Sequence, residues 1–130
     1  MVMENNFSII ISTCDKFSDL WDAHILLLNQ NWADRNVETF LVTDKPTDRT
    51  FKNVTVVAAG EGTEITERLK AVMPLIKTEY ILFTLDDYFL TESISTQAIN
   101  EDIQIMEKHQ MDYLRLFVMT MKSLRNRKAE

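Results

Sequence analysis

The apolar residues of this chain follow two periodicities that alternate along the sequence. Unbroken apolar and β-branched runs, typical of strands buried on both faces, predict strands over 7–13, 37–43, 54–59 and 80–85. Between these runs, apolar residues recur at every third or fourth position, as on one face of a helix. That spacing predicts helices over 18–32, 65–76 and 95–110, followed by a last strand over 113–120.

Single residues refine these predictions. Ser18 can cap the first helix, because a serine oxygen accepts a hydrogen bond from a free backbone N–H group at a helix start. Pro74 lies inside the second helix, so we expect a kink or an early end near Met73. The run over 80–85 is the clearest candidate for a fully buried strand.

The order of the predicted elements indicates the fold class. Strands that alternate with helices and are apolar across their whole width indicate a mostly parallel sheet that is covered on both faces. Right-handed crossovers then give an α/β fold, a three-layer α/β/α sandwich with a Rossmann-like sheet. The 130 residues contain no linker, so the sequence predicts one domain over 1–130 that ends in a basic tail at 121–130.

The charge of the chain is unevenly distributed. The formal net charge of −6 disfavours binding to nucleic acid, which depends on neutralising phosphates. Four basic residues against one acid give the last nine residues a charge of +3 and leave −9 for the remainder. A solvated terminus is the simpler interpretation, and a weak contact with anionic lipid headgroups or phosphates is the alternative.

Three features bear on the compartment. No stretch approaches the roughly 18 uninterrupted apolar residues of a membrane span. The opening six residues lack the basic and then apolar pattern of a secretory signal. The single cysteine, Cys14, excludes an intramolecular disulfide and suits a reducing compartment. The sequence therefore predicts a cytoplasmic protein without a transmembrane segment.

Acidic residues follow each of the first four predicted strands, and after the strand at 54–59 the acid is Glu61. Asp15 and Asp44 follow the first two strands, and Asp86-Asp87 directly follows the strand at 80–85. The carboxyl ends of parallel strands share one edge of a sheet, and ligands bind outside that edge. Carboxylates that converge there repel one another unless a cation lies between them, and a hard divalent cation prefers such oxygen ligands.

A local explanation competes with this interpretation for the single acids. Aspartate favours turns and helix starts, so Asp15 and Asp44 can follow strands for local reasons. The pair Asp86 and Asp87 lies between apolar runs, where a carboxylate without a partner would be costly to desolvate. The pair is therefore the strongest candidate for a functional site.

Other reactive side chains have simpler interpretations. His24 and His109 lie in predicted helices without a second ligand at a metal-binding spacing, so a structural or solvated role is expected. Cys14 has no recognisable motif around it. The sequence also lacks the glycine-rich signatures of P-loop and dinucleotide-binding proteins and the serine elbow of α/β-hydrolases.

Three segments together carry a family resemblance. Residues 78–90 read TEYILFTLDDYFL, residues 67–70 read ERLK, and residues 12–21 read STCDKFSDLW. These segments are similar to the TEY and LDDYFL motifs that flank an apolar strand, to the ERLK helix start and to the opening STCDKYSDLW of bacterial glycosyltransferases of the GT-A type. The similarity extends over most of residues 7–90.

The resemblance implies a Rossmann-like domain that binds a nucleotide-sugar donor with Mn²⁺ or Mg²⁺, in the synthesis of cell-surface polysaccharide. The metal would be held by Asp86 and Asp87 and would neutralise the leaving nucleoside diphosphate. In the family the first strand and the second border the nucleotide, and the helix start approaches its phosphates or base. Carried over by position, the residues that would contact the donor are Thr13, Asp15, Asp44, Arg68 and Asp86.

The sequence departs from the family in two ways. Tyr88 stands two positions after Asp86, where the usual motif has a second acid. Such enzymes are also about twice as long, because a second half supplies the acceptor site and the general base. No catalytic base and no acceptor is therefore assigned. The chain is interpreted as a shortened relative, a fragment, or a module that binds donor without transferring sugar.

Two non-enzymatic interpretations stay open. A receiver-like signalling module fits the length and the α/β alternation, although its acidic pair would follow the first strand, where only Asp15 stands. An assembly subunit could derive from a donor-binding scaffold. An exposed apolar surface in place of the second half would then favour homo-oligomers.

Overall fold

The computed structural model describes residues 5–114 and 116. Its contacts group into two compact units that divide between Asn100 and Glu101. The predicted strand over 113–120 and the basic tail at 121–130 fall mainly or wholly outside the described residues. The single domain over 1–130 stays a prediction.

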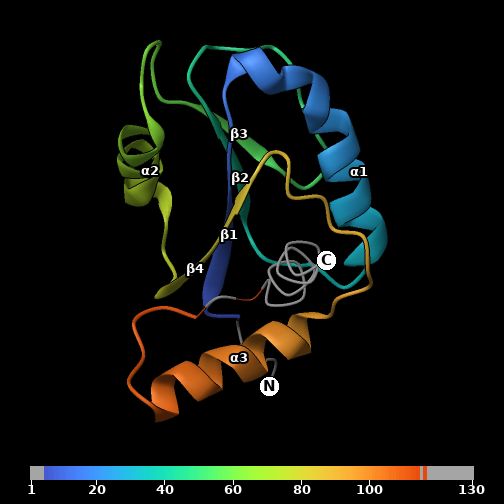
Figure 1. The fold of residues 1–130 in the computed structure, drawn as a ribbon, viewed down its shortest axis with the longest axis vertical. Coiled ribbons are helices and arrows are strands. Elements are labelled where there is room, and N and C mark those ends of the chain that lie inside the picture. Colours follow the sequence, from blue (N-terminus) through green and yellow to red (C-terminus); the bar gives the residue numbers. More distant parts are fainter. Residues whose placement is uncertain (1–4, 115, 117–130) are drawn as a thin grey trace, which may run out of the picture. The chain divides into compact units, whose positions relative to one another are not determined.

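A four-stranded, fully parallel sheet forms the centre of the first unit (Figure 1). Strand β1 pairs with β2 on one side and with β4 on the other, and β2 pairs with β3. The spatial order is therefore β3-β2-β1-β4. The bounds of the strands are Phe7–Ser12 for β1, Thr39–Thr43 for β2, Thr55–Ala58 for β3 and Tyr80–Leu85 for β4. This sheet confirms the predicted α/β class.

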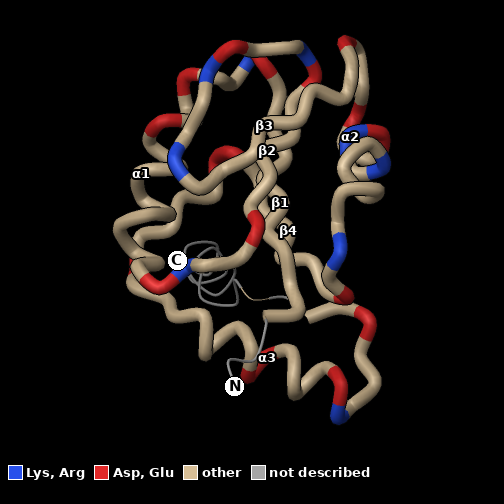
Figure 2. The backbone as a smooth tube through the Cα atoms, turned by 180° about the vertical axis from the view of Figure 1, so that it is seen from behind, with Lys and Arg blue, Asp and Glu red and all other residues tan. Residues whose placement is uncertain are grey.

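Helices α1 (Trp21–Asn31) and α2 (Ile65–Val72) lie on opposite faces of this sheet (Figures 1 and 2). The chain runs outward from β1 to β2 and β3, then returns past β1 to form β4. Because crossovers are right-handed, this reversal of direction moves the connecting helix to the other face. A third helix, α3, runs over Thr96–Lys108 across the boundary between the two units.

Each face of β1 contributes to a different part of the core. Phe7 faces α1, and its ring stacks on Trp32 with centroids 6.1 Å apart. Ile10 faces α2 and packs with Phe40, Val42 and Val72. The predicted inner face of the first helix is confirmed, because its four apolar positions are buried: Trp21, Ile25, Leu28 and Trp32.

The ends of two helices show which local signals hold. A 3₁₀ helix over Asp15–Leu20 precedes α1, so Ser18 lies within it and the predicted cap is wrong. The expectation for Pro74 is confirmed, since α2 ends at Val72 and a 3₁₀ turn over Met73–Leu75 follows. Pro74 lacks the N–H group that a continued helix would need.

Strand β4 corrects the expectation of a fully buried strand. It lies at the edge of the described sheet, and Phe83 is 39% exposed. Within the strand only Thr84 is buried. An apolar run shows that a strand is suited to burial on both faces, but its position in the sheet depends on the crossovers. Of the helices that the structure describes, none combines the length and apolar character needed to cross a membrane.

Candidate functional site

The strand order reverses between β1 and β4, and this reversal defines the candidate site. From β1 the chain first turns toward β2, and after β3 it returns to the opposite side of β1. Both loops border α1, because the loop after β1 leads into this helix and the loop after β4 contacts its residues His24 and Asn31. In open parallel sheets, ligands bind outside the carboxyl edge at the point where the strand order reverses. Here the two loops begin with Thr13 and Asp86.

A short hydrogen bond joins these two loops. The hydroxyl of Thr13 donates to Oδ2 of Asp86 over 2.6 Å, and the indole Nε1 of Trp21 donates to the same hydroxyl over 2.8 Å. Thr13 is 2% exposed, whereas Asp86 is half-buried. Since the hydroxyl accepts from the indole, its own hydrogen is directed at the carboxylate. Trp21 and Thr13 therefore fix the orientation of the Asp86 carboxylate.

His24 holds the backbone at the same place. It lies one helical turn after Trp21, is 3% exposed, and donates from Nδ1 to the carbonyl oxygen of Asp86 over 3.1 Å. Its ring also contacts Phe89, with centroids 6.1 Å apart. Burial lowers the pKa of His24, and it outweighs the hydrogen bond to Asp86 and the charges of Asp86 and Asp87, which raise it.

The lowered pKa of His24 predicts how the stability of the folded chain depends on pH. Below the ordinary pKa of 6.5 the unfolded chain takes up a proton at His24 before the folded chain does. The stability linked to neutral His24 is therefore full above pH 6.5 and is lost as the pH falls from there toward the lower folded pKa. We expect His24→Asn, which keeps a donor near the Asp86 carbonyl, to flatten this part of the stability profile.

Urea denaturation at a series of pH values measures this effect. The matched control is His109→Asn, because His109 is exposed near the end of α3. An equal flattening in the two variants, or in neither, would contradict the assignment to His24.

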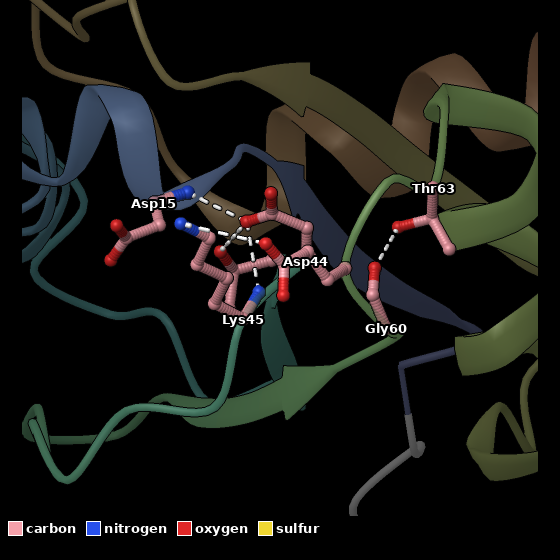
Figure 3. A network of polar contacts seen from close by, with 7 residues as sticks. Asp15, Asp44, Lys45, Gly60 and Thr63 are labelled. Atoms are coloured by element: carbon pink, nitrogen blue, oxygen red, sulfur yellow. Dashed lines mark hydrogen bonds and ion pairs between the residues drawn. The ribbon is translucent and has the colours of Figure 1, made fainter.

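A second set of contacts joins the loops after β1 and β2 (Figure 3). The backbone N–H groups of Asp15 and Lys45 donate to Oδ1 of Asp44 over 2.8 and 2.9 Å, and the Thr43 hydroxyl donates to it over 3.2 Å. Desolvation raises the pKa of Asp44, but these hydrogen bonds, with one from its own backbone, lower it overall. Local donors therefore stabilise this carboxylate, and the contacts of Asp15 are made by its backbone.

The contacts continue along the edge to α2. The N–H group of Gly60 donates to the carbonyl oxygen of Asp44 over 2.8 Å, and the Thr63 hydroxyl donates to the Gly60 carbonyl over 2.7 Å (Figure 3). Gly60 has a φ of 127°, a conformation that side chains disfavour. Thr63 in turn accepts a hydrogen bond from Nη1 of Arg68 at its carbonyl. The loops after β2 and β3 thus connect Asp44 to Arg68.

Arg68 lies beside a hollow at the start of α2. Its side chain is on the face of α2 that bears Val72, and the residue is only 9% exposed. Nε has no hydrogen-bond partner among the described residues, and no described acid pairs with the guanidinium. The hollow measures ≈ 390 Å³ and is lined by Thr63, Glu64, Ile65, Thr66 and Arg68. The Nε–H group of Arg68 therefore has no acceptor among the described residues, and Glu64 adds a negative charge to the same lining.

Two of the predicted residues lie at the candidate metal position. Asp86 is half-buried and is oriented by Thr13, whereas Asp87 is exposed. Within residues 5–114 and 116, no group of three or more histidine, cysteine, aspartate or glutamate side chains is arranged to hold a metal ion. A cation on the Asp86 and Asp87 carboxylates therefore stays a prediction from the sequence. Mg²⁺ is commonly bound through one or two carboxylates plus waters and substrate phosphates.

Comparison with known proteins yielded no match to a family model, to a curated protein or to a solved structure. The glycosyltransferase resemblance thus stays a prediction that rests on the sequence motifs.

The structural role expected for His24 agrees with its burial, but neither its contact with Asp86 nor the hydrogen bond from Trp21 to Thr13 was predicted from the sequence. A signal existed, because His24 follows Trp21 by three positions and precedes Leu28 by four, which places it on the buried stripe of α1. In α2 the apolar spacing identifies the buried face only in part. Ile65 and Met73 are exposed, whereas Arg68 is buried four positions before Val72.

Proposed function

We propose that this chain binds a nucleotide-sugar donor with a divalent cation at the carboxyl edge of its sheet, as the donor-binding part of a glycosyltransferase. The observation that carries the proposal is the 2.6 Å hydrogen bond from Thr13 to Asp86 at the point where the strand order reverses. A carboxylate held in a fixed orientation at the carboxyl edge of a parallel sheet is suited to bind a cation or a ligand hydroxyl.

The cation would be Mn²⁺ or Mg²⁺ on Asp86 and Asp87, and when bound it would neutralise the charge that develops on the leaving diphosphate. The chain itself contributes orientation. One oxygen of the Asp86 carboxylate accepts the hydrogen bond from Thr13, so the other oxygen is held in a fixed orientation for a cation. His24 restrains the backbone of Asp86. These restraints reduce the entropy lost on binding, because the acidic loop is already ordered.

The remaining predicted residues would contact the rest of the donor. The Nε–H group of Arg68 has no partner among the described residues and the side chain lies beside the hollow, so Arg68 is suited to the phosphates or the base. Asp44 is ionised and locally stabilised, and its second carboxylate oxygen is suited to accept from a ribose hydroxyl. Asp15 borders the same loop. The acceptor and any general base are not assigned.

A panel of UDP- and GDP-sugars tests donor binding. Each is added to the full chain with Mn²⁺, with Mg²⁺ or with a chelator, and the midpoint of thermal unfolding is measured. A donor at about one hundred times its dissociation constant stabilises by about 2.7 kcal/mol, which raises the midpoint by about 10 °C. We expect at least one nucleotide-sugar to produce this rise in a metal-dependent manner.

Free sugar and inorganic phosphate serve as ligand controls, because neither contains the nucleotide. If every donor leaves the midpoint unchanged with either metal, the proposal is wrong. If a donor raises the unfolding midpoint equally with metal and with chelator, that result would support donor binding and contradict a role for the metal in it.

A further inference from the structure

A second cationic pocket lies at the opposite edge of the sheet from the candidate donor site. It forms where the end of α1 and the loop leading into β2 meet the turn that precedes β3, so it borders the amino ends of these strands. Its volume is ≈ 170 Å³, and it is lined by Asn29, Trp32, Ala33, Arg35, Lys52 and Asn53.

Arg35 is held in this pocket by neutral partners. Nη1 donates to Oδ1 of Asn29 over 2.8 Å, and Nη2 donates to the carbonyl oxygen of Asn53 over 3.3 Å. Nε is buried without a hydrogen-bond partner among the described residues. Burial also lowers the pKa of Arg35, since the charged guanidinium has lost part of its water. Of its five N–H groups, the described residues thus satisfy a minority.

The turn before β3 adds a second cation. Asn53 has a φ of 61°, which asparagine tolerates better than most residues, and the turn brings its carbonyl to Arg35. Lys52 precedes it, is exposed, and forms no ion pair with a described residue. No acid lines the pocket, and the neighbouring Asp34 carboxylate instead accepts from the backbone N–H of Thr96.

We infer that this pocket binds a tetrahedral oxyanion, either inorganic phosphate or the phosphoryl group of a phosphomonoester. The guanidinium of Arg35 and the ammonium of Lys52 supply two positive charges, and the Asn29 and Asn53 amide groups supply further polar contacts. Unpaired guanidinium N–H groups match the oxygens of a phosphate in a forked geometry. The inference is independent of donor binding, because the pocket lies at the other edge of the sheet.

The two tryptophans allow the pockets to be tested separately by NMR. Trp32 lines the cationic pocket, whereas the indole N–H of Trp21 donates to Thr13 at the candidate donor site. We expect inorganic phosphate, titrated at constant ionic strength against chloride, to shift the Trp32 indole resonance and to leave that of Trp21 unchanged. Glycerol phosphate, titrated in the same way, shows whether a phosphomonoester is bound as well as the free ion.

Variants assign the effect to the pocket. Lys52→Met and Arg35→Gln should each weaken phosphate binding about tenfold, as expected for loss of a hydrogen bond to a charged group. The matched control is Lys70→Met, because Lys70 lies on the exposed side of α2, away from this pocket. If Arg35→Gln does not fold, Lys52→Met still tests phosphate binding, because Lys52 is exposed and its substitution should leave the fold intact.

Two results would overturn the inference. One is a Trp32 resonance that responds to phosphate no more than to chloride. The other is an equal loss of binding in Lys52→Met and Lys70→Met, which would indicate general attraction between charges.

Discussion

Replacing Trp32 with alanine is expected to lower the free energy of unfolding by about 3–5 kcal/mol, a large part of the total stability of a domain this size. Trp32 is 2% exposed, and its ring stacks on Phe7 in β1. Its indole Nε1 donates to the hydroxyl of Thr96 over 3.0 Å. The substitution therefore opens a large cavity and also leaves a buried hydroxyl with one partner fewer.

Urea denaturation followed by circular dichroism measures this loss. Trp32→Phe should retain most of the apolar contact and lose only the Thr96 hydrogen bond, so its cost should be smaller by at least about 1 kcal/mol. Leu26→Ala is the matched control, because Leu26 lies on the same helix and is 57% exposed. If Trp32→Ala cost no more than Leu26→Ala, the packing described for α1 against β1 would be wrong.

The sequence identified the elements well because their periodicities are strong. β1 and β2 are buried along their whole length, and an unbroken apolar run is what such strands require. α1 was located from a stripe that the structure buries completely. The parallel arrangement followed from the alternation of strands and helices.

What the sequence did not determine was the position of each element in the sheet. β4 has an apolar run similar to that of β1, yet β4 lies at the edge of the described sheet and β1 at its centre. Local residues cannot distinguish these positions, because strand order depends on crossovers between distant segments. The desolvation argument for Asp86 and Asp87 weakens accordingly, since Asp87 is exposed.

At the candidate site, too, the sequence predicted some features and not others. The sequence predicted that acidic side chains would meet at the carboxyl edge; the structure shows the backbone N–H of Asp15 at the Asp44 carboxylate and the Thr13 hydroxyl at the Asp86 carboxylate. It did not predict that backbone N–H groups would stabilise Asp44, because those contacts depend on loop geometry. Repulsion between acids can thus be relieved by local donors as well as by a cation.

The Asp86→Asn variant is expected to bind a nucleotide-sugar with Mn²⁺ about a hundredfold more weakly than the unaltered chain. The comparison uses a donor that raises the unfolding midpoint of the unaltered chain. Asparagine keeps the shape of aspartate and removes the negative charge that a cation requires. It can still accept the Thr13 hydrogen bond through its amide oxygen, so the fold should be retained. Calorimetric titration measures the affinity, and circular dichroism checks the fold.

Thr13→Val separates the orientation of Asp86 from its charge. Valine keeps the volume but removes the hydroxyl that lies between Trp21 and Asp86, so we expect a smaller loss of affinity, of about tenfold. Asp48→Asn is the charge-matched control, because Asp48 is exposed in the loop after β2. Unaltered affinity in Asp86→Asn, with donor binding intact in the parent chain, would move the donor site away from the β1–β4 reversal. Equal losses in Asp86→Asn and Asp48→Asn would instead assign the effect to net charge, and the Thr13–Asp86 contact would then have only a structural role.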